Sequence, residues 1–465
     1  MTDPVVIIGA GPAGLSCAAE LAQAGREVVL IDDNPIAGGQ YFRQLPTAYG
    51  TAPNARLLRD KTRFDELAKV LTLQGVRYLP STIAWGMPDP RTIAYAGQAG
   101  SGRIRASNVV IATGAQEKSL PFPGWTLPGV ISAGGCLNLA KAHGLVPNGR
   151  MVIAGNGPLV LVAAATMIAA GAQIEAVLEA QLDRKLVTSA LRGLVASPKI
   201  LATGLGYRAR ILQSGTPFKT GWMIAEARGK DCLQVVAIAP IGVDGRPVRK
   251  SQRWIQADTL VIGYGLLPGS ETARVMGCRM ELKSELNGVV PQRSAELETS
   301  VNGVYAIGDG AGIGGAEIGL MEGKIAANAI LRRSSPASLK ARYDRLDRYR
   351  RFLNLAYATS KPLIAATADT IICRCEEITL GRLAADPNSD GDNLNALKIS
   401  SRLGMGRCQG RNCLHVASKL LGFDAEAQPA HPRARPPLRP VKLAQLAADK
   451  DAGAAREPDE ITASE

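Results

Sequence analysis

The chain has 465 residues, of which 46% are hydrophobic and 20% charged, enough to build and solvate the cores of two or three domains. This composition excludes intrinsic disorder, collagen and coiled coil, and 50 glycines with only 4% aromatic residues are typical of nucleotide-binding α/β proteins. Lysine and arginine exceed aspartate and glutamate by 13, which favours acidic partners or phosphates, whereas the lack of a basic stripe interleaved with aromatic residues argues against nucleic acid.

A strand, a glycine-rich turn and a helix open the chain. Residues 4–8 are apolar and lead into a G-x-G-x-x-G turn, whose first glycine permits the tight turn, whose second lets the backbone approach a pyrophosphate, and whose third allows close packing of helix on strand. A second strand, 27–31, ends at two aspartates, of which Asp32 can accept hydrogen bonds from both ribose hydroxyls. This βαβ unit predicts a dinucleotide site formed by Gly9, Gly11, Pro12, Ala13, Gly14, Asp32 and Asp33.

Three later motifs complete the same predicted site. They are Gly38-Gly39-Gln40, then Ala112-Thr113-Gly114 after a strand at 108–112, and Gly308-Asp309 after a late strand. We expect Asp309 to hold the ribityl or pyrophosphate group, while the helix that begins near Ala316 points its N-terminus at the isoalloxazine edge of a flavin. This late strand and helix are predicted to return to the first domain, so that the second domain is inserted within it.

A second strand-turn-helix pattern begins at Met151. The segment 151–174 has no charged residue and imitates a membrane span, but its internal Gly-Asn-Gly-Pro turn favours a buried βα unit, and no transmembrane segment is predicted. Val160 replaces the third glycine, and its branched side chain is expected to push helix and strand apart. NAD binding here stays open: Glu179 can bind an NAD ribose, or the domain packs without a nicotinamide.

These motifs together resemble the two-dinucleotide-domain flavoprotein family that includes glutathione and thioredoxin reductases. The resemblance covers about residues 1–335 and implies FAD in the first domain. Disulfide reduction needs two neighbouring cysteines beside the flavin. The cysteines of this region stand alone, which argues against that reaction, and we expect them to be buried apolar fillers; they are Cys17, Cys136, Cys232 and Cys278. No signal peptide precedes the first strand, so we expect a cytoplasmic protein with reduced thiols.

Four further cysteines lie close together near the C-terminus. Cys373-x-Cys375 is followed, after thirty-two residues, by Cys408-x-x-x-x-Cys413. Four thiolates suit zinc or an iron–sulfur cluster, but the C-x-C spacing argues against zinc, whose paired ligands are usually two to four residues apart. Interleaved arginines can offset the negative charge of a cluster, and neighbouring glycines leave backbone N–H groups free to approach the sulfurs; they are Arg374, Arg407, Arg411, Gly404, Gly406 and Gly410.

The segment GMGRCQGRNC resembles the [2Fe–2S] domain of the bacterioferritin-associated-ferredoxin type, although that family often closes with C-x-x-C. The whole chain resembles the alpha (A) subunits of hetero-oligomeric opine oxidases, hydrogen cyanide synthase and dye-linked proline and hydroxyproline dehydrogenases. The resemblance implies a [2Fe–2S] cluster on the four cysteines, a flavin-containing beta subunit that oxidises the amine, an external electron acceptor, and FMN at a subunit interface. No catalytic residue is assigned to this chain, and its histidines, His143, His415 and His431, are expected at the surface or in packing.

The leading hypothesis is an electron-transfer subunit that relays electrons from the amine-oxidising partner to the acceptor. The rival is a self-sufficient NAD(P)H-dependent reductase, and a third possibility is an assembly module whose FAD and cluster are structural. The predicted fold class is α/β, with two Rossmann-like dinucleotide-binding domains, the second inserted in the first, and a small C-terminal helical [2Fe–2S] domain. The predicted divisions are an FAD-binding domain at 1–118 and 295–335, a second domain at 119–294, a polar connector at 336–367 expected to include a solvated helix, a cluster domain at 368–425, and a Pro/Arg-rich arm and tail at 426–465 that docks on this chain or on a partner.

Overall fold

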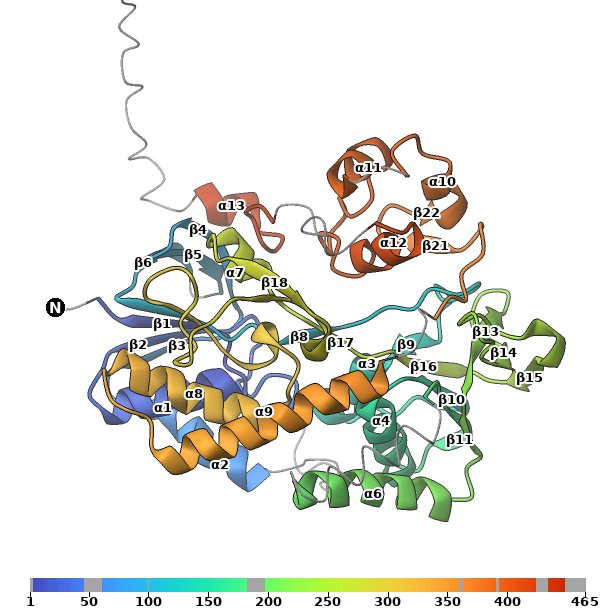
Figure 1. Cartoon of the computed structure of the whole chain (residues 1–465), viewed down its shortest axis with the longest axis horizontal. Helices are drawn as coiled ribbons and strands as arrows, with labels where there is room; N and C mark the ends of the chain where they lie inside the picture. The colour runs from blue at the N-terminus through green and yellow to red at the C-terminus, as the bar shows by residue number, and fades with distance from the viewer. Residues whose placement is uncertain are drawn as a thin grey trace, which may run out of the picture.

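The structure is a computed structural model that describes residues 3–45, 61–98, 100–181, 197–358, 363–389, 393–423 and 434–447. Two α/β domains lie side by side, the long helix α9 runs along both, and a small unit formed by β21 to α12 sits above the second domain (Figure 1). The predicted α/β fold class is confirmed. None of the described helices is both long enough and apolar enough to cross a lipid bilayer.

The first domain is built on a parallel sheet with the strand order β20-β7-β1-β2-β3. Its strands are Val304–Ala306, Asn108–Ile111, Val5–Ile8, Val28–Ile31 and Val76–Leu79 in that order. Helices α1 (Pro12–Gln23) and α8 (Ala316–Ile330) pack against each other on one face, joined by α2 (Lys61–Ala68) and η3 (Lys69–Thr72). The other face packs on the antiparallel strands β4 (Thr82–Asp89), β5 (Thr92–Gly97) and β6 (Gly100–Arg105). Because both faces are covered, the central strands are continuous apolar runs.

The second domain repeats this plan with the strand order β12-β11-β10-β16-β9. Its strands are Phe218–Thr220, Gln173–Glu179, Arg150–Gly155, Thr259–Gly263 and Val130–Ser132, and its helices are α3 (Ala133–His143), α4 (Pro158–Ala169) and α6 (Pro198–Gln213). The uncharged segment 151–174 forms β10, α4 and the start of β11, so the predicted buried βα unit is confirmed. A small antiparallel sheet packs on this domain; it consists of β13 (Trp222–Arg228), β14 (Val235–Pro240) and β15 (Arg253–Gln256), with η4 (Arg249–Ser251) just before β15.

Two antiparallel strands link the domains, β8 (Ala115–Glu117) leading out and β17 (Leu266–Pro268) leading back. After β17 come α7 (Glu271–Val275), β18 (Met280–Lys283), η5 (Ser284–Leu286), β19 (Gly288–Pro291) and, after β20, η6 (Gly308–Ala311). The pairing of β20 with β7 returns the chain to the first sheet, as expected for an inserted second domain. Residues of α7 and the turn after it, such as Ala273 and Met276, already share the core of the first domain, so the packing returns there earlier than the predicted boundary at residue 295.

Helix α9 (Ala337–Tyr357) occupies the predicted connector but is not solvated on all sides. Leu346, Tyr349 and Arg350 are buried, and the helix packs against α8 and η5. The alternating charges of this segment predict a solvated helix. The buried side could not be predicted from them, because an arginine that pairs with a carboxylate can be buried. The last residue of α9 also accepts a hydrogen bond from Asn156 of the second domain, so one helix contacts both nucleotide-binding domains.

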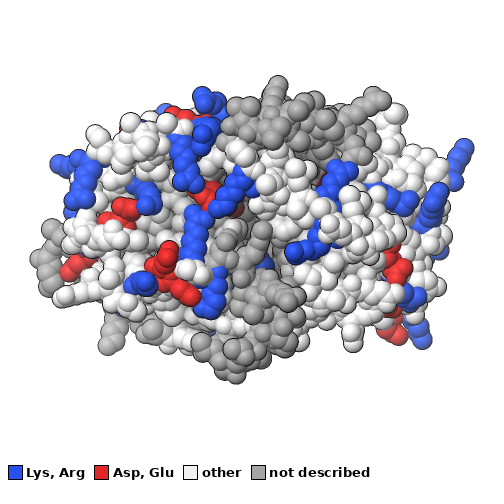
Figure 2. Space-filling view, turned by 90° about the horizontal axis from the view of Figure 1, so that it is seen from below, with Lys and Arg blue, Asp and Glu red and all other residues white. Residues whose placement is uncertain are grey.

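The cysteine unit has its own apolar core, as predicted. It contains β21 (Ile371–Cys373), β22 (Ile378–Thr379), α10 (Leu380–Ala384), α11 (Leu394–Ser401) and α12 (Leu414–Leu420). The arm, described from residue 434, returns to the first domain: the Leu438 N–H donates to the Trp85 carbonyl (2.8 Å), and its side chain enters the core beneath β4 and β5. Helix α13 (Leu443–Ala447) then contacts β5 and β6. The arm thus docks on this chain. On the face shown in Figure 2, basic side chains are separated by acidic and uncharged ones.

Candidate functional site: two nucleotide folds and four thiols around one cavity

The first glycine-rich turn has the geometry that its sequence predicts. Gly9 has a positive φ of 111°, and a Cβ there would overlap the Ala112 carbonyl. A Cβ on Gly14 would overlap the Gly9 carbonyl oxygen, whereas a Cβ on Gly11 would meet only the Gly39 Cα at 3.9 Å. Gly9 and Gly14 are therefore needed for folding, while Gly11 keeps space open at the N-terminus of α1, where backbone N–H groups and the helix dipole favour a phosphate.

Asp32 ends β2 directly beside this turn. Its carboxylate accepts hydrogen bonds from the Ala10 N–H (2.6 Å) and from the Asn34 backbone N–H (2.8 Å). Burial raises the pKa of Asp32, and the bonds from Asn34 oppose that shift. Asp33 instead faces solvent and pairs with Arg439 of the arm at 3.6 Å. Only Asp32 is placed against the predicted pyrophosphate turn.

The other predicted cofactor motifs converge on the same turn. A Cβ on Gly39 would meet the Gly11 Cα at 2.9 Å, while Gln40 is exposed. The Ala112 N–H donates to the Ile8 carbonyl (2.9 Å), which sets the end of β7 beside the end of β1. Gly114 has a positive φ of 67°, a Cβ on it would point into open space, and the Thr113 hydroxyl donates to the Gly269 carbonyl (2.7 Å). Three loops thus close around one site.

Gly308 and Asp309 come to this site through the packing of α8 on α1. A Cβ on Gly308 would meet the Ala13 Cβ at 3.0 Å, so the two loops are in contact. The Asp309 carboxylate accepts hydrogen bonds from the Gly314 and Gly315 N–H groups, both at 2.8 Å, and burial raises its pKa. Asp309 lines the large cavity described below. This arrangement fits a carboxylate that orders the loop before α8 and faces the flavin end of a dinucleotide.

Glu322 in α8 holds this loop from behind and was not found by sequence reasoning. Its carboxylate is fully buried, accepts a hydrogen bond from the Gly308 N–H (2.6 Å) and pairs with Arg293 (3.2 Å) and Arg350 (3.4 Å). The Tyr343 hydroxyl donates to it at 3.1 Å. No motif includes Glu322, because its partners come from segments far apart in the chain.

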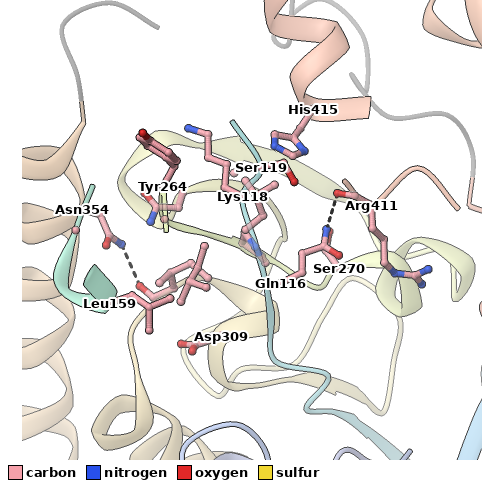
Figure 3. Close-up of a pocket in the computed structure, with 18 of the residues that line it drawn as sticks. Gln116, Lys118, Ser119, Leu159, Tyr264, Ser270, Asp309, Asn354, Arg411 and His415 are labelled. Carbon is pink, nitrogen blue, oxygen red and sulfur yellow. Dashed lines mark hydrogen bonds between the residues drawn. The ribbon is translucent and has the colours of Figure 1, made fainter. Parts of the chain in front are cut away.

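A cavity of about 1040 Å³ lies where the first domain, the second domain and the cysteine unit meet (Figure 3). Asp309 and the N-terminus of α8 line it from the first domain, and the turn of residues 156–158 lines it from the second. The loop 409–411, His415 and part of the arm complete the wall. The predicted flavin end of the FAD site and the cysteine unit therefore face a common space.

The second glycine-rich turn is folded differently from the sequence expectation. Val160 does not push α4 away from β10, because two glycines, Gly155 and Gly263, lie beneath it and leave room for its branched side chain. Glu179 is 1% exposed, its carboxylate accepts hydrogen bonds from the Gly157 N–H (3.3 Å) and the Gln181 N–H (3.4 Å), and burial raises its pKa to about 8.

The end of α9 sits on this second turn. The Asn156 side-chain amide donates to the Tyr357 carbonyl (2.7 Å), and the Gln181 amide donates to the Ala356 carbonyl (2.7 Å). A helix C-terminus carries partial negative charge, so the carbonyl oxygens at the end of α9 make the neighbourhood of this turn less favourable for a phosphate. The side-chain amides of Asn156 and Gln181 thus find hydrogen-bond partners within the chain.

The four late cysteines come together from two loops. Hydrogen bonds with the Cys413 thiol lower the pKa of Cys373 and of Cys408, and Cys408 is also bonded to Cys375. Backbone N–H groups of Gly404, Glu376 and Cys375 point at the Cys373 sulfur, and those of Asn412 and Gly410 point at Cys408. A Cβ on Gly406 would overlap the Cys375 side chain. Within the described residues no group of three or more His, Cys, Asp or Glu side chains is placed so that it could hold a metal ion, although four thiols are the donor set that an iron–sulfur cluster uses.

Arg411 connects these cysteines to the flavin motifs. Its guanidinium donates to the Cys408 carbonyl (3.1 Å) and to the Leu438 carbonyl (2.9 Å), and it lies 3.6 Å from Glu271 at the start of α7. Gln116, two residues after the Ala112-Thr113-Gly114 motif, donates to the Arg411 carbonyl at 3.4 Å. The cysteine loop is thus fixed against the strand that leaves the predicted flavin site.

Most of the isolated cysteines and the described histidines lie where the sequence predicts. Cys17, Cys136 and Cys278 are buried as expected, whereas Cys232 is exposed, so the expectation of a buried filler is wrong there. Among the histidines His143 is exposed, His415 is 8% exposed and packs at the cavity wall, and His431 lies outside the described residues. The described histidines therefore offer no base inside the glycine-rich turns.

Gly11 and Gly14, the second and third glycines of the first turn, give a prediction that distinguishes loss of FAD binding from loss of folding. Gly11→Val is expected to fold but to purify without FAD, because its side chain fills the phosphate space while meeting no close neighbour. Gly14→Val is expected to fail to fold, because it collides with the Gly9 carbonyl. Visible absorbance and far-UV circular dichroism of both variants check this, and stoichiometric FAD in folded Gly11→Val would show that the turn is misassigned.

The chain is similar to known proteins in sequence and in fold. The model of the pyridine nucleotide-disulphide oxidoreductase family matches residues 3–330. The A subunit of opine oxidase from Agrobacterium tumefaciens is 32% identical over 95% of this chain and 91% of its own length. The HcnB subunit of hydrogen cyanide synthase from Pseudomonas aeruginosa is 32% identical over 90% of this chain and 92% of its own length.

Among solved structures, L-proline dehydrogenase from P. horikoshii superimposes with a TM-score of 0.67 at 18% identity, covering 96% of this chain and 79% of that one. This likeness supports the fold along nearly the whole chain. The chain therefore belongs to the pyridine nucleotide-disulphide oxidoreductase family, and within it is an FAD-type oxidoreductase related to the A subunit of opine oxidase.

Proposed function

We propose that this chain is the electron-transfer subunit of a hetero-oligomeric dehydrogenase that acts on an amino acid or an opine, of the proline, hydroxyproline or opine type. A flavin-containing beta subunit oxidises the amine, and this chain carries the electrons to an external acceptor. The observation that carries the proposal is the common cavity, which the flavin motifs and the cysteine unit line together. Its similarity to HcnB and to the A subunit of opine oxidase, both named as subunits, supports the need for a partner.

The proposal assigns a [2Fe–2S] cluster to Cys373, Cys375, Cys408 and Cys413. Backbone N–H groups directed at two of the sulfurs support it, since such bonds stabilise thiolates and tune a cluster. FAD accepts electrons in pairs and a cluster passes them on singly. The residues of this chain hold both groups at fixed positions, with Arg411 tying the cysteine loop to the flavin domain. The resemblance to the A-subunit family also implies an FMN that is bound between this chain and the beta subunit.

The rival function, an NAD(P)H-dependent reductase, needs a second fold that accepts a nicotinamide nucleotide. The contact of α9 with Asn156 and Gln181 argues against it, because phosphates would have to displace two helix-end carbonyls. We infer that the second fold serves packing and that electrons reach this chain from the beta subunit.

The test is an anaerobic titration of the purified chain with and without its beta subunit. NADH is expected to leave the flavin absorbance of the isolated chain unchanged, whereas the amine substrate is expected to bleach it only when the beta subunit is present. Cys408→Ser is expected to lose the reduced-state paramagnetic signal of [2Fe–2S] and to retain FAD, because the cysteine unit has its own core.

Three results would contradict the proposal. Bleaching by NADH alone favours the reductase. Robust dye reduction by the isolated chain with proline, hydroxyproline or an opine places amine oxidation in this chain. One zinc and no iron in anaerobically prepared protein removes the electron-transfer role of the cysteines.

A further inference from the structure

The small antiparallel sheet of the second domain has an excess of positive charge. Residues 218–256, which form β12 to β15 and their loops, contain seven lysines and arginines but three acidic residues. The whole chain has a surplus of 13 positive charges over 465 residues. The surplus is therefore denser in this sheet than in the chain as a whole.

Most of this charge is not neutralised. Arg228 and Arg249 share one carboxylate, that of Glu226, from which Arg249 lies 3.9 Å away. Three further cations are exposed and form no ion pair with a described residue; they are Lys230, Arg246 and Lys250. A positive surface that is open to solvent attracts acidic macromolecules over a distance of about 10 Å.

Tryptophans lie among these cations. The Arg228 guanidinium lies over the ring of Trp254 at 4.6 Å, yet Trp254 remains 40% exposed. The loop between β14 and β15 exposes two apolar side chains as well, Val243 and Val248. Contacts between proteins are enriched in tryptophan and arginine, which supply much of the binding energy, and are rimmed by polar groups. This composition is typical of a surface that binds another protein.

The same geometry argues against single-stranded nucleic acid as the partner. Proteins that bind it stack the bases on open aromatic faces. Here Arg228 lies over Trp254, and Lys219 and Arg253 lie over Trp222 at 5.0 and 5.7 Å. An acidic protein needs no open ring face, because its carboxylates can pair with the exposed ammonium and guanidinium groups.

The sheet adjoins the cysteine unit. It lies at the outer end of the second domain, beneath β21 (Figure 1). In the loop between β14 and β15, the Gly245 carbonyl accepts a hydrogen bond from the Ile364 N–H (3.1 Å), which belongs to the segment that leads into β21. The basic sheet and the cysteine unit are therefore in direct contact.

Trp125 forms a second connection between them. It packs in the apolar core beneath β13 and β14, and its indole N–H donates to the Ile371 carbonyl of β21 (2.7 Å). The guanidinium of Arg374, which separates the two cysteines of the C-x-C motif, lies over the Trp125 ring at 5.2 Å. Arg374 and the next residue, Cys375, are exposed. A protein bound on the sheet would thus border the loop that carries an exposed cysteine.

We propose that the exposed surface of β13–β15 is the docking site of an acidic electron-carrier protein, which serves as the external acceptor. The basic docking surface consists of Arg228, Lys230, Arg246, Arg249, Lys250, Arg253 and Trp254. This inference rests on the proposed electron-transfer function, in which oxidation of one C–N bond releases two electrons and two protons. Two oxidised carriers dock in turn and take one electron each, and the protons pass to solvent. Small, charge-steered contacts are typical of such encounters.

The experiment measures binding of a plant-type [2Fe–2S] ferredoxin, an acidic one-electron carrier, to the oxidised FAD-loaded full chain by calorimetry. Saturable binding is expected at low salt, and about 0.3 M salt is expected to weaken it by about tenfold or more, because exposed charges are then screened. Arg246→Glu combined with Lys250→Glu is expected to weaken binding at low salt by about tenfold or more, since two unpaired charges are reversed. Trp254→Ala is expected to weaken it by about tenfold through loss of an apolar contact.

The matched control reverses two exposed basic residues of the first domain, Lys69 in η3 and Arg77 in β3. Lys69→Glu combined with Arg77→Glu is expected to bind ferredoxin as the unchanged chain does. Both double variants are expected to retain FAD and the far-UV circular dichroism of the unchanged chain, because all four side chains are exposed. The comparison therefore measures the position of the reversed charges and not the net charge.

The docking surface is overturned if the unchanged chain shows no saturable ferredoxin binding, or if the two double variants lose equal affinity. It is also overturned if reversal of Arg246 and Lys250 leaves ferredoxin binding intact and instead weakens binding of the beta subunit, of single-stranded DNA or of phosphatidylserine vesicles. Dye reduction by the unchanged chain with its beta subunit and amine is measured in parallel. Dye reduction without ferredoxin binding removes the docking surface alone, whereas absence of both removes the proposed function as well.

Discussion

Replacement of Glu322 with glutamine is expected to lower the free energy of unfolding by about 3–5 kcal/mol and to empty the FAD site. Glu322 is fully buried and is shared by two buried arginines, Arg293 and Arg350. A neutral amide leaves both guanidinium groups without their common carboxylate in a place that water does not reach. Arg350 keeps its ion pair with Asp347 (2.5 Å), so the cost comes mainly from the charge of Arg293, which is larger than the contribution of the intact pair.

The FAD site is affected because Glu322 also accepts the Gly308 N–H. This bond fixes the loop that carries Asp309, and the loop contacts the first turn through Ala13. Glu322→Gln is therefore expected to purify with little flavin even where it remains folded. Urea denaturation followed by circular dichroism gives the stability, and flavin absorbance gives the FAD content.

Glu317→Gln is the matched control. Glu317 lies in the same helix and also pairs with two arginines, Arg63 and Arg342, but it is partly exposed. Exposed pairs contribute less than about 1 kcal/mol, so this variant is expected to keep its flavin and nearly all its stability. Equal behaviour of the two variants would contradict the role assigned to Glu322.

The second large effect is the response to pH of Glu179, whose pKa burial raises to about 8. In the unfolded chain this carboxyl titrates at its ordinary value near 4.5, so between these values the folded state binds the extra proton. Stability from this group is complete below the unfolded pKa and is lost as the pH rises through the folded pKa. At 1.36 kcal/mol per pKa unit the loss is on the order of 5 kcal/mol at pH 9.

Glu179→Gln is expected to remove this slope, because glutamine stays neutral and can still accept the Gly157 and Gln181 N–H bonds. The measurement is the melting temperature by calorimetry at pH 6 and pH 9 for the protein and the variant. Lys118, whose pKa is lowered, acts in the opposite direction, so the variant must be compared with the unchanged protein. Glu175→Gln in the same strand, β11, is the control, and an unaltered slope in Glu179→Gln would show that the carboxyl is ionised when folded.

Much of the first domain follows from local sequence patterns. The roles of Gly9 and Gly14, the position of Asp32 and the strand-turn-helix order are properties of a few neighbouring residues, and the structure confirms each. The βα unit at 151–174 could be distinguished from a membrane helix for the same reason, since its turn lies within the segment.

Contacts between distant segments could not be predicted in this way. Val160 was expected to spoil helix packing because the glycine beneath it at Gly263 lies about a hundred residues later. Helix α9 looked solvated because the groups that bury Arg350 against the first domain, the Glu322 carboxylate of α8 and the Gly312 carbonyl, come from other segments. The site residues that could not be predicted are those whose role depends on contacts with residues far away in the sequence.

The return of the arm has a consequence for biosynthesis. Leu438 completes a core that includes residues of the first hundred, such as Val6 and Ile93. A ribosome makes the chain from the N-terminus, so this core of the first domain waits for its last apolar side chain until residue 438 has been synthesised. Chains that terminate before residue 434 would lack this side chain and would expose more of the core, which favours aggregation. Completion of the FAD-binding domain thereby reports that the cysteine unit has already been translated.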